Sequence, residues 1–248
     1  MGFINRRVGW TITLFKSFDN PVKKNWKRIK TIGWFSIEQE KLYSNRDVQG
    51  LADPFLVTHN NQVFIFFESI INGKGEIWQA ELLDDIVCNI KPIIADSFHV
   101  SYPNVFLHNK QYYMIPETGD DFSIRLYKAI NFPDIWEFVK KLYVGKQLLD
   151  TSFVKLNNYY YWFTYDFESK ENLLFFSKSF DSTWKRHPNS NSSNYRNGGQ
   201  IFKHGEDIIR PVQIGKKAYG EGLSLLKITA LTPIVIKEEL YQEKFLYK

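Results

Sequence analysis

A sequence unit of about 48 residues recurs along the chain, and this repeat restricts the possible folds more than any other feature. Three copies share a short strand, an Asn-rich turn and an aromatic strand: ADPFLVTHNNQVFIFFES (52–69), SYPNVFLHNKQYYMIPET (101–118) and DTSFVKLNNYYYWFTYD (150–166). The segment IIRPVQ (208–213) marks a fourth copy. Long internal periods of this kind are typical of solenoids and propellers.

A third strand follows in each copy, and a Trp begins a fourth strand in two of them. The third strands start at Ile77, Leu126, Leu174 and Ser224, and the two tryptophans are Trp136 and Trp184. Four short strands per unit match a propeller blade, whereas a β-sandwich would not explain the regular spacing. TITLFKSF (11–18) and KRIKTIGWFSI (27–37) indicate a fifth unit, which the C-terminal KFLYK (244–248) would complete.

We therefore predict an all-β fold, a five-bladed β-propeller with four-stranded blades. The whole chain, 1–248, is expected to form one domain, with both termini contributing to the remaining blade. The blade repeats are expected to begin near residues 53, 102, 150 and 198.

The composition indicates the cellular compartment and whether a disulfide or a metal site is expected. The single cysteine, Cys88, excludes an internal disulfide, and no Cys/His group has metal-ligand spacing, so we expect a reducing compartment and no metal or other cofactor. The N-terminal MGFINRRVGWTITLFKSF is interrupted by polar residues and indicates a strand rather than a signal peptide. No apolar run approaches the roughly 20 residues that span a bilayer. The expected location is cytoplasmic, with the inner face of the membrane as an alternative.

The net charge of +5 includes one dense basic stretch, KKNWKRIK (23–30). Such a stretch can attract nucleotide phosphates, anionic lipid or nucleic acid. Its alternating pattern favours a solvated edge strand protected by lysines. We expect no nucleic-acid partner and retain peripheral membrane association as an alternative.

Hairpin geometry predicts which residues meet. The first residue of a copy and the last residue of its hairpin should lie at the same end of a blade, and the turn between the strands at the other. The expected pairs are Asp53 with Glu68, Tyr102 with Glu117, Asp150 with Tyr165, and Gly198 with Gln213. The turn residues His59, His108 and His204 should lie at the opposite end, which disfavours a shared metal site.

The predicted mouth gathers carboxylates. Its expected members are Asp53, Glu68, Glu117, Asp150 and Asp166, together with Arg210 and Gln213. Two carboxylates that flank a sugar can act as general acid and general base. In the alternative interpretation, Glu68 and Glu117 only close their hairpins by accepting hydrogen bonds from backbone N–H groups.

Eleven short motifs, in order, carry a resemblance to a known family. They are ADPFLV, FFE, SYPNVF, YYMIPET, IRLYKA, FPDIW, DTSFV, YYYWFT, GGQIF, IIRPVQ and YGEGLSLLKI, between about Gly50 and Leu240. Together they resemble the N-terminal propeller-like domain of plant glucosamine inositolphosphorylceramide transferases and its bacterial polysaccharide-biosynthesis relatives. More distantly, that domain resembles the five-bladed propellers of glycoside hydrolase family 43.

The distant resemblance implies roles for three positions. Asp53, followed by Pro54, matches the catalytic base, Asn104 takes the position of the acid-tuning Asp, and Asp150 takes the position of the acid. Two of the three depart from the pattern, because Asn104 has no charge and Asp150 is one methylene shorter than Glu. Ordinary glycosidase activity is therefore disfavoured, although a sugar can still bind.

Three further residues complete the candidates. His99 lies in the link between the first two copies and either reaches the mouth or serves as a loop residue. Arg210 either clamps a phosphate or carboxylate of the substrate or forms a salt bridge with a neighbouring acid. Tyr219, with Gly220, is expected to shape the same rim.

The leading hypothesis is an enzyme of glycosyltransferase or glycoside-hydrolase type, acting on a cell-surface glycan or glycolipid intermediate. Its catalytic candidates are Asp53, Asp150 and Glu117, and its substrate-binding candidates are Glu68, His99, Tyr102, Asn104, Asp166, Arg210, Gln213 and Tyr219. The alternative is a non-catalytic glycan-binding or scaffold domain that partners a glycan-biosynthesis enzyme. The expected ligand is a sugar or glycan, with a nucleotide sugar as a further option.

Overall fold

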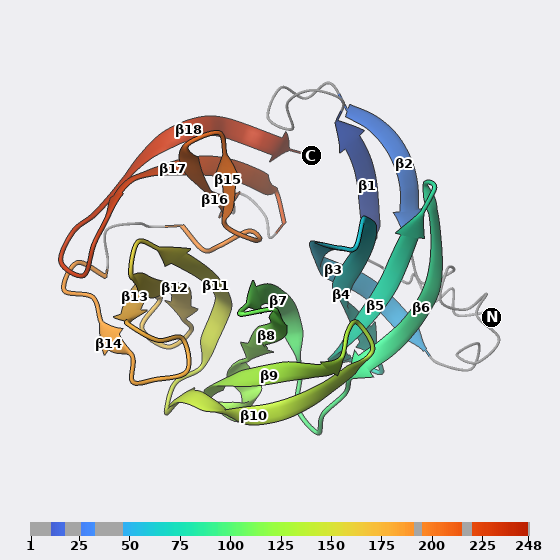
Figure 1. Ribbon diagram of the computed structural model, residues 1–248, viewed down its shortest axis with the longest axis horizontal. Coiled ribbons are helices and arrows are strands. Elements are labelled where there is room, and N and C mark those ends of the chain that lie inside the picture. Colours follow the sequence, from blue (N-terminus) through green and yellow to red (C-terminus); the bar gives the residue numbers. More distant parts are fainter. Residues whose placement is uncertain (1–10, 18–25, 33–46, 191–194, 215–219, 248) are drawn as a thin grey trace, which may run out of the picture. The chain divides into compact units, whose positions relative to one another are not determined.

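The chain is described here by a computed structural model covering residues 11–17, 26–32, 47–190, 195–214 and 220–247. The described residues form an all-β structure with one two-stranded sheet and four four-stranded sheets (Figure 1). The predicted all-β class and the four-stranded repeat are confirmed.

Each four-stranded sheet is built from strands consecutive in the sequence. The first sheet holds β1 (Ile12–Ser17) and β2 (Trp26–Ile32). The second holds β3 (Val48–His59), β4 (Gln62–Ile71), β5 (Lys74–Leu83) and β6 (Ile86–Ile94). The third holds β7 (Ser101–His108), β8 (Gln111–Thr118), β9 (Ser123–Asn131) and β10 (Ile135–Val144). The fourth holds β11 (Leu148–Leu156), β12 (Tyr159–Asp166), β13 (Glu171–Ser177) and β14 (Lys185–Arg186). The fifth holds β15 (Phe202–His204), β16 (Asp207–Ile214), β17 (Gly222–Leu231) and β18 (Ile236–Tyr247).

The Asn-rich turns explain why the hairpins form where they do. Asn60 and Asn61, between β3 and β4, have φ angles of 48° and 63°, and Asn109 and Lys110, between β7 and β8, have 48° and 64°. Two consecutive residues with positive φ match the twist of a tight β-hairpin, and Asn tolerates this conformation well. The turns predicted from the sequence are confirmed.

A second repeated feature lies at the start of the first strands. Asp53, Tyr102 and Asp150 occupy equivalent positions in β3, β7 and β11, with φ angles of 49°, 49° and 50°. Two of these positions fall within register shifts of the β3–β4 and β11–β12 pairs. The exact strand partners of Glu68 and Tyr165 are consequently Ala52 and Leu149, one residue before the predicted Asp53 and Asp150.

Aromatic side chains fill the core between sheets. In the fourth sheet Trp162 is fully buried, and its ring stacks on that of Trp184 at 3.7 Å between centroids. The predicted role of Trp184 at the start of a fourth strand is confirmed, because β14 begins at the next residue. Large rings of this kind bury much apolar surface at positions that face a neighbouring sheet.

The chain divides into two compact units, residues 1–105 with 129–136, and residues 106–128 with 137–248. The prediction of a single domain over 1–248 is not settled by this division and stays a prediction.

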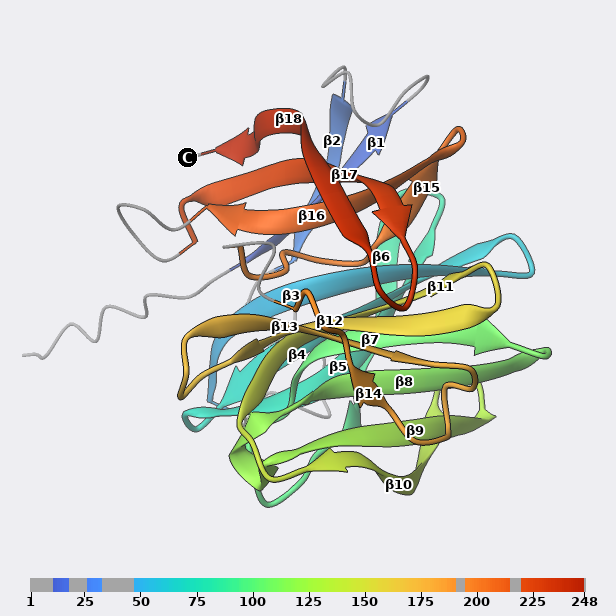
Figure 2. The ribbon, with the colours of Figure 1, turned by 90° about the vertical axis from the view of Figure 1, so that its left-hand side faces the viewer.

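The C-terminal segment corrects one expectation. Residues 244–247, expected to complete the fifth unit, belong to β18, which pairs with β17 along most of its length (Figure 2). Gly222 pairs with Tyr247 and Leu231 with Ile236. In the described part of the chain, β1 pairs only with β2, so the closure of a blade by both termini is not seen there.

Candidate functional site

The predicted site residues fall into two groups, one in each compact unit. The first unit contains Asp53, Glu68, His99, Tyr102 and Asn104, and the second contains Glu117, Asp150, Asp166, Arg210 and Gln213. Tyr219 lies outside the described residues. That both groups share one mouth stays a prediction.

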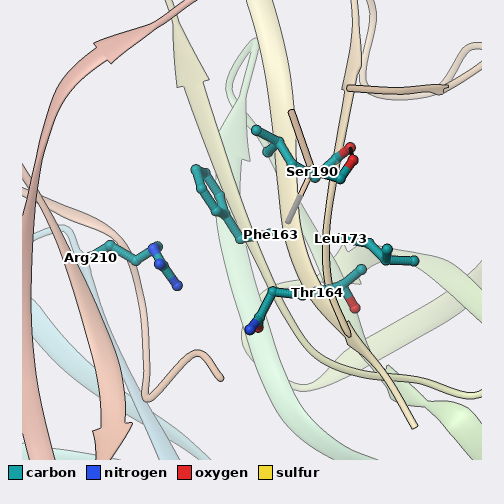
Figure 3. Close-up of a pocket in the computed structure, with 7 residues that line it drawn as sticks. Phe163, Thr164, Leu173, Ser190 and Arg210 are labelled. Atoms are coloured by element: carbon teal, nitrogen blue, oxygen red, sulfur yellow. Dashed lines mark hydrogen bonds between the residues drawn. The ribbon is translucent and has the colours of Figure 1, made fainter. Parts of the chain in front are cut away.

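In the second unit a small pocket lies between the fourth and fifth sheets. Its lining residues are Phe163, Thr164, Asn172, Leu173, Leu174, Ser190 and Arg210. Figure 3 shows Arg210 extending toward Phe163, and the guanidinium carbon lies 5.0 Å from the centre of that ring. The space holds about one water molecule, so this pocket is too small for a sugar.

Arg210 is held by protein groups. Its Nε and Nη2 donate to the two carboxylate oxygens of Glu238 at 2.7 and 2.8 Å, in the bidentate geometry that guanidinium favours. The side chain is almost fully buried. Of the two interpretations offered by the sequence, the structure shows the salt bridge, with a partner on β18 that was not among the predicted acids.

Asn197 connects Arg210 to the fourth sheet. Its side-chain oxygen accepts a hydrogen bond from Arg210 Nη1 at 2.8 Å, and its side-chain nitrogen donates to the carbonyl oxygens of Asp150 and Phe163, each at 2.7 Å. Both the nitrogen and the oxygen of this buried amide therefore have hydrogen-bond partners, as is usual for a buried polar group. Asn197 was not among the residues predicted from the sequence, although it stands one residue before the predicted start of the fourth copy at 198.

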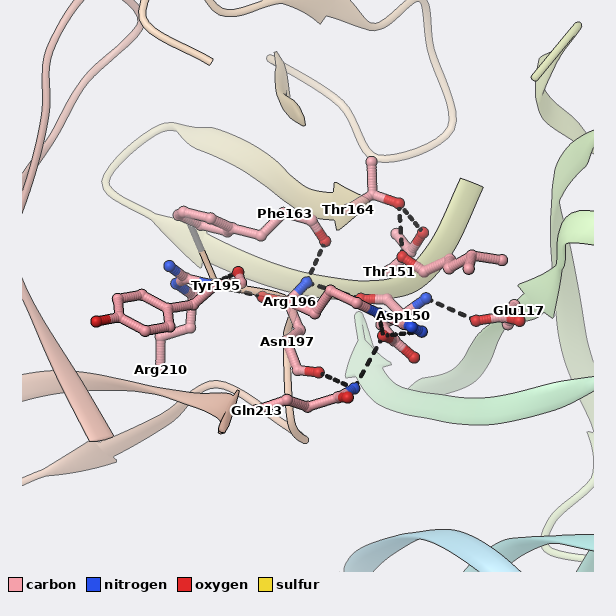
Figure 4. A network of polar contacts seen from close by, with 11 residues as sticks. Glu117, Asp150, Thr151, Phe163, Thr164, Tyr195, Arg196, Asn197, Arg210 and Gln213 are labelled. Atoms are coloured by element: carbon pink, nitrogen blue, oxygen red, sulfur yellow. Dashed lines mark hydrogen bonds and ion pairs between the residues drawn. The ribbon is translucent and has the colours of Figure 1, made fainter. Parts of the chain in front are cut away.

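The carboxylate of Asp150 is the centre of the network (Figure 4). Its Oδ2 accepts hydrogen bonds from Arg196 Nε at 2.7 Å and from Gln213 Nε2 at 3.0 Å, and lies 2.6 Å from Arg196 Nη2. Arg196 also lies over the ring of Tyr165, with its guanidinium carbon 5.2 Å from the ring centre. The sequence did not identify Arg196, because no local pattern marks a contact that spans 46 residues.

Glu117 fixes the backbone of Asp150. Its Oε2 accepts a hydrogen bond from the Asp150 N–H at 2.7 Å. The structure thus shows a carboxylate that binds a backbone N–H, as the alternative interpretation expected, but the N–H belongs to β11 of the next sheet. Glu117, Asp150 and Gln213 are brought together as predicted.

Asp166 has a structural partner of its own. Its carboxylate is buried, forms an ion pair with Lys146, and accepts a hydrogen bond from the Glu168 N–H at 3.1 Å. Burial disfavours the charged form, but the hydrogen bonds from Lys146 and Ser169 outweigh it and hold the pKa of Asp166 below its ordinary value. Asp166 therefore closes the β12–β13 turn as a carboxylate.

In the first unit, Glu68 and His99 form a fixed pair. His99 Nδ1 accepts a hydrogen bond from the Gly75 N–H at 3.0 Å, and His99 Nε2 lies 2.9 Å from Glu68 Oε1. Because Nδ1 is an acceptor, the proton of the neutral ring is on Nε2 and is donated to Glu68. The structure brings His99 to Glu68, and so to the end of the β3–β4 hairpin where Asp53 lies.

The remaining candidates of the first unit line the same end of β3 and β7. Asp53 is half-buried, whereas Tyr102 and Asn104 are buried. The ring of Tyr102 packs edge-on against Phe55 at 4.9 Å between centroids. Tyr102 therefore has a packing role in addition to its predicted position.

The turn histidines lie at the other end of their hairpins. His59 pairs with Gln62 and His204 with Asp207, each as the last pair before the turn. His108 contacts Tyr160 and Phe180 rather than Glu117. No group of three metal-binding side chains occurs among the described residues. In the same residues, none of the helical segments has the length and apolar character required to cross a membrane.

Comparison with solved structures identifies the fold. The alpha-L-arabinofuranosidase PaAbf62A from Podospora anserina matches with a TM-score of 0.61 and 14% identity, over 78% of this chain and 68% of that one. The alpha-L-arabinofuranosidase CtGH43 from Clostridium thermocellum matches with a TM-score of 0.58 and 15% identity, over 89% and 80%. Identities this low show the fold alone, which is the predicted five-bladed β-propeller.

Sequence comparison identifies the family. The family model described as glucosamine inositolphosphorylceramide transferase 1, N-terminal, matches residues 39–244, and the chain belongs to this family. The transferase 1 proteins of Oryza sativa subsp. japonica and Arabidopsis thaliana are each 32% identical, over 204 and 210 residues. These alignments cover 76% and 78% of this chain but only 27% and 26% of the relatives. The chain therefore spans about a quarter of the length of the curated relatives it matches.

Proposed function

We propose that this chain is a carbohydrate-active propeller domain that binds the sugar of a glycan or glycolipid intermediate during glycosyl transfer. Its family supports the choice, because the relatives are named glucosamine inositolphosphorylceramide transferase 1. A nucleotide sugar, a membrane surface and a partner glycan-biosynthesis enzyme are proposed as further components. A cytoplasmic location, including the inner face of a membrane, remains part of the proposal.

The environment of Asp150 carries the assignment of a binding role. A general acid must carry a proton and give it to the leaving group. Asp150 Oδ2 instead faces two nitrogen atoms of Arg196 and the amide of Gln213, all within 3.0 Å. Asp150 is itself buried, so its carboxylate is suited to hold Arg196 and Gln213 in position for a sugar rather than to give up a proton.

Catalysis by Asp53 is the second candidate. Asp53 has a φ of 49°, a conformation that costs free energy in most non-Gly residues and is often found at functional sites. It also matches the position that the resembling hydrolases use for the base. In this version of the proposal Asp53 removes a proton from the attacking hydroxyl group.

Calorimetry with the full chain tests the binding role. The probes are glucosamine and myo-inositol 1-phosphate, which represent the two groups in the relatives' names. Wild type is expected to bind at least one probe, and Asp150→Asn should weaken this binding at least about tenfold, because the acceptor shared by Arg196 and Gln213 loses its charge. The matched control is Asp207→Asn, whose carboxylate pairs with Lys227 at the hairpin turn and should leave binding unchanged.

Turnover separates the two candidates. The chain is incubated with UDP-N-acetylglucosamine and vesicles containing inositolphosphorylceramide, and glycolipid products are followed by mass spectrometry. Turnover that falls at least about 100-fold in Asp53→Asn would establish catalysis by this chain. Binding without turnover would establish the recognition domain. Absence of both would refute the proposed function.

A further inference from the structure

Two exposed phenylalanines flank the connector that leads into Asp150. Phe122 lies just before β9 and is 50% exposed, and Phe167 lies just after β12 and is 45% exposed. Both are in the second compact unit. The connector between β10 and β11 is 145–147, and Asp150 follows it by three residues. None of the sequence candidates included these two aromatic residues.

Backbone hydrogen bonds hold both phenylalanines against this connector. The Gly145 N–H donates to the Phe122 carbonyl oxygen at 2.8 Å, and the Phe167 N–H donates to the Gln147 carbonyl oxygen at 3.0 Å. The Gln147 side chain also donates to Asp120 at 3.4 Å, in the same turn as Phe122. The two aromatic residues are therefore positioned by one short segment at the end of β11 where Asp150 lies.

Phe122 has a left-handed backbone conformation, and its side chain is exposed. Its φ of 50° is in the left-handed region, which is uncommon for a bulky side chain. Its N–H and carbonyl oxygen are both used, with the N–H donating to the Gly119 carbonyl oxygen at 2.9 Å. This left-handed residue ends the short 3-10 helix Gly119–Asp121, and it leaves the Phe122 ring exposed beside the connector.

The surroundings of the rings are suited to an amino sugar or a neutral sugar. Lys170 Nζ lies 3.6 Å from the centre of the Phe167 ring, so a cation occupies one face of this aromatic group. Asp120 and Glu168, on the same two turns, are exposed. The C–H face of a pyranose ring can pack on an aromatic ring while neighbouring carboxylates accept hydrogen bonds from its hydroxyl or amino groups.

We propose that Phe122 and Phe167 form an aromatic subsite for a pyranose ring of an oligosaccharide, extending the site centred on Asp150. This inference rests on the proposed function and deepens it, because it assigns the domain a ligand of more than one sugar residue. The ring nearest Asp150 occupies the polar site, and a following ring packs on the phenylalanines.

Titration calorimetry with the full chain compares glucosamine with its β-1,4-linked trimer. Phe122→Ala and Phe167→Ala should each lower the affinity for the trimer by about fivefold or more and change the affinity for glucosamine by less than about twofold. Phe122→Tyr should retain trimer binding because the ring is kept. Phe138→Ala is the matched control, since Phe138 is 44% exposed and lies on β10, where its ring contacts Tyr127.

The outcomes separate the subsite from the proposed function. If glucosamine binds to wild type and the trimer-to-monomer affinity ratio is unchanged in both folded Phe→Ala variants, the subsite is refuted and the proposed function stands. An equal loss of both affinities would also refute it, since the turns would then act only on the structure of the polar site. Failure of wild type to bind either sugar refutes the subsite, whereas the proposed function is refuted only if wild type also fails to bind myo-inositol 1-phosphate and shows no turnover.

Discussion

The charge state and partners of individual carboxylates decide what each can do in this domain. Asp150 and Asp166 are both buried acids at the same end of the β11–β12 hairpin, yet their partners differ. Asp150 is held by Arg196 and Gln213, whereas Asp166 is held by Lys146 and two backbone N–H groups. Of the two, only Asp150 belongs to a network that reaches several strands, so it is the better candidate for the proposed binding role.

The ion pair of Asp166 gives the first prediction, a pH dependence of stability. Because the folded-state pKa of Asp166 lies below the unfolded value, its stabilisation is present above about pH 4 and is lost as the pH falls through the lower folded value. Asp166→Asn keeps an oxygen for the turn N–H groups but removes the charge. It should lower the free energy of unfolding by about 1 kcal/mol at neutral pH, since Lys146 is 37% exposed.

Urea unfolding of wild type and Asp166→Asn between pH 2 and pH 7 measures this difference. The gap between the two proteins should shrink as the solution becomes more acidic than about pH 4. A gap that stays constant to pH 2 would show that charge on Asp166 contributes nothing.

At the scale of elements, the second prediction concerns the glycine that joins β5 to the link before β7. A Cβ at Gly75 would lie 2.6 Å from Glu68 Oε1 and 2.7 Å from the Val100 carbonyl oxygen. Backbone oxygen cannot move away easily, so Gly75→Ala should displace His99 and cost about 1–3 kcal/mol. Chemical denaturation gives the cost, and the NMR signals of the His99 imidazole report its contact with Glu68.

Gly73→Ala is the control for Gly75→Ala. Gly73 has a φ of 78°, and a Cβ at this position would have no other atom within 4 Å, so alanine there meets only the left-handed backbone cost of about 1–2 kcal/mol. The His99 signals should not change in this variant. Equal shifts of the His99 signals in both variants would contradict the steric argument.

The third prediction concerns the pair that joins β16 to β18. Removing the charge of Glu238 would leave the buried guanidinium of Arg210 without its bidentate partner. Glu238→Gln should therefore lower the free energy of unfolding by about 3 kcal/mol or more. Glu239→Gln changes the neighbouring side chain, which is 61% exposed and 4.0 Å from Lys227, and should cost at most about 1 kcal/mol. Guanidinium unfolding measures both costs. A similar decrease in the free energy of unfolding in the two variants would show that the buried pair contributes no more stability than the exposed one.

These elements also show what the sequence could and could not predict. Asn60, Asn61 and the aromatic strands after them are local signals, because turn chemistry and alternation act over a few residues. The hairpins were therefore predicted correctly, but the strand partners of Glu68 and Tyr165 lie one residue before those predicted. Arg196 and Asn197 were missed, since their contacts with Asp150 depend on how two sheets pack and span 46 and 47 residues.

For the whole molecule, the repeat predicted the fold class but not which sheet the C-terminal residues join. A period of about 48 residues identifies blades because each blade repeats the same strand order. The C-terminal strand carries no such internal copy, and β18 extends to Tyr247, which places 244–247 beside β17 rather than in another blade. A terminal strand can pair with either neighbouring edge, and only tertiary contacts decide between them.

The last prediction is that the two compact units unfold together. The division between them falls inside three strands, after residue 105 of β7, after residue 128 of β9 and after residue 136 of β10. Separate unfolding of one unit would leave each of these three strands ordered over only part of its length, which disfavours a stable half-folded state. Differential scanning calorimetry of the full chain should show one transition, with equal calorimetric and van't Hoff enthalpies. Two resolved transitions, or a van't Hoff enthalpy well below the calorimetric one, would instead establish two independent domains and overturn the single-domain prediction for residues 1–248.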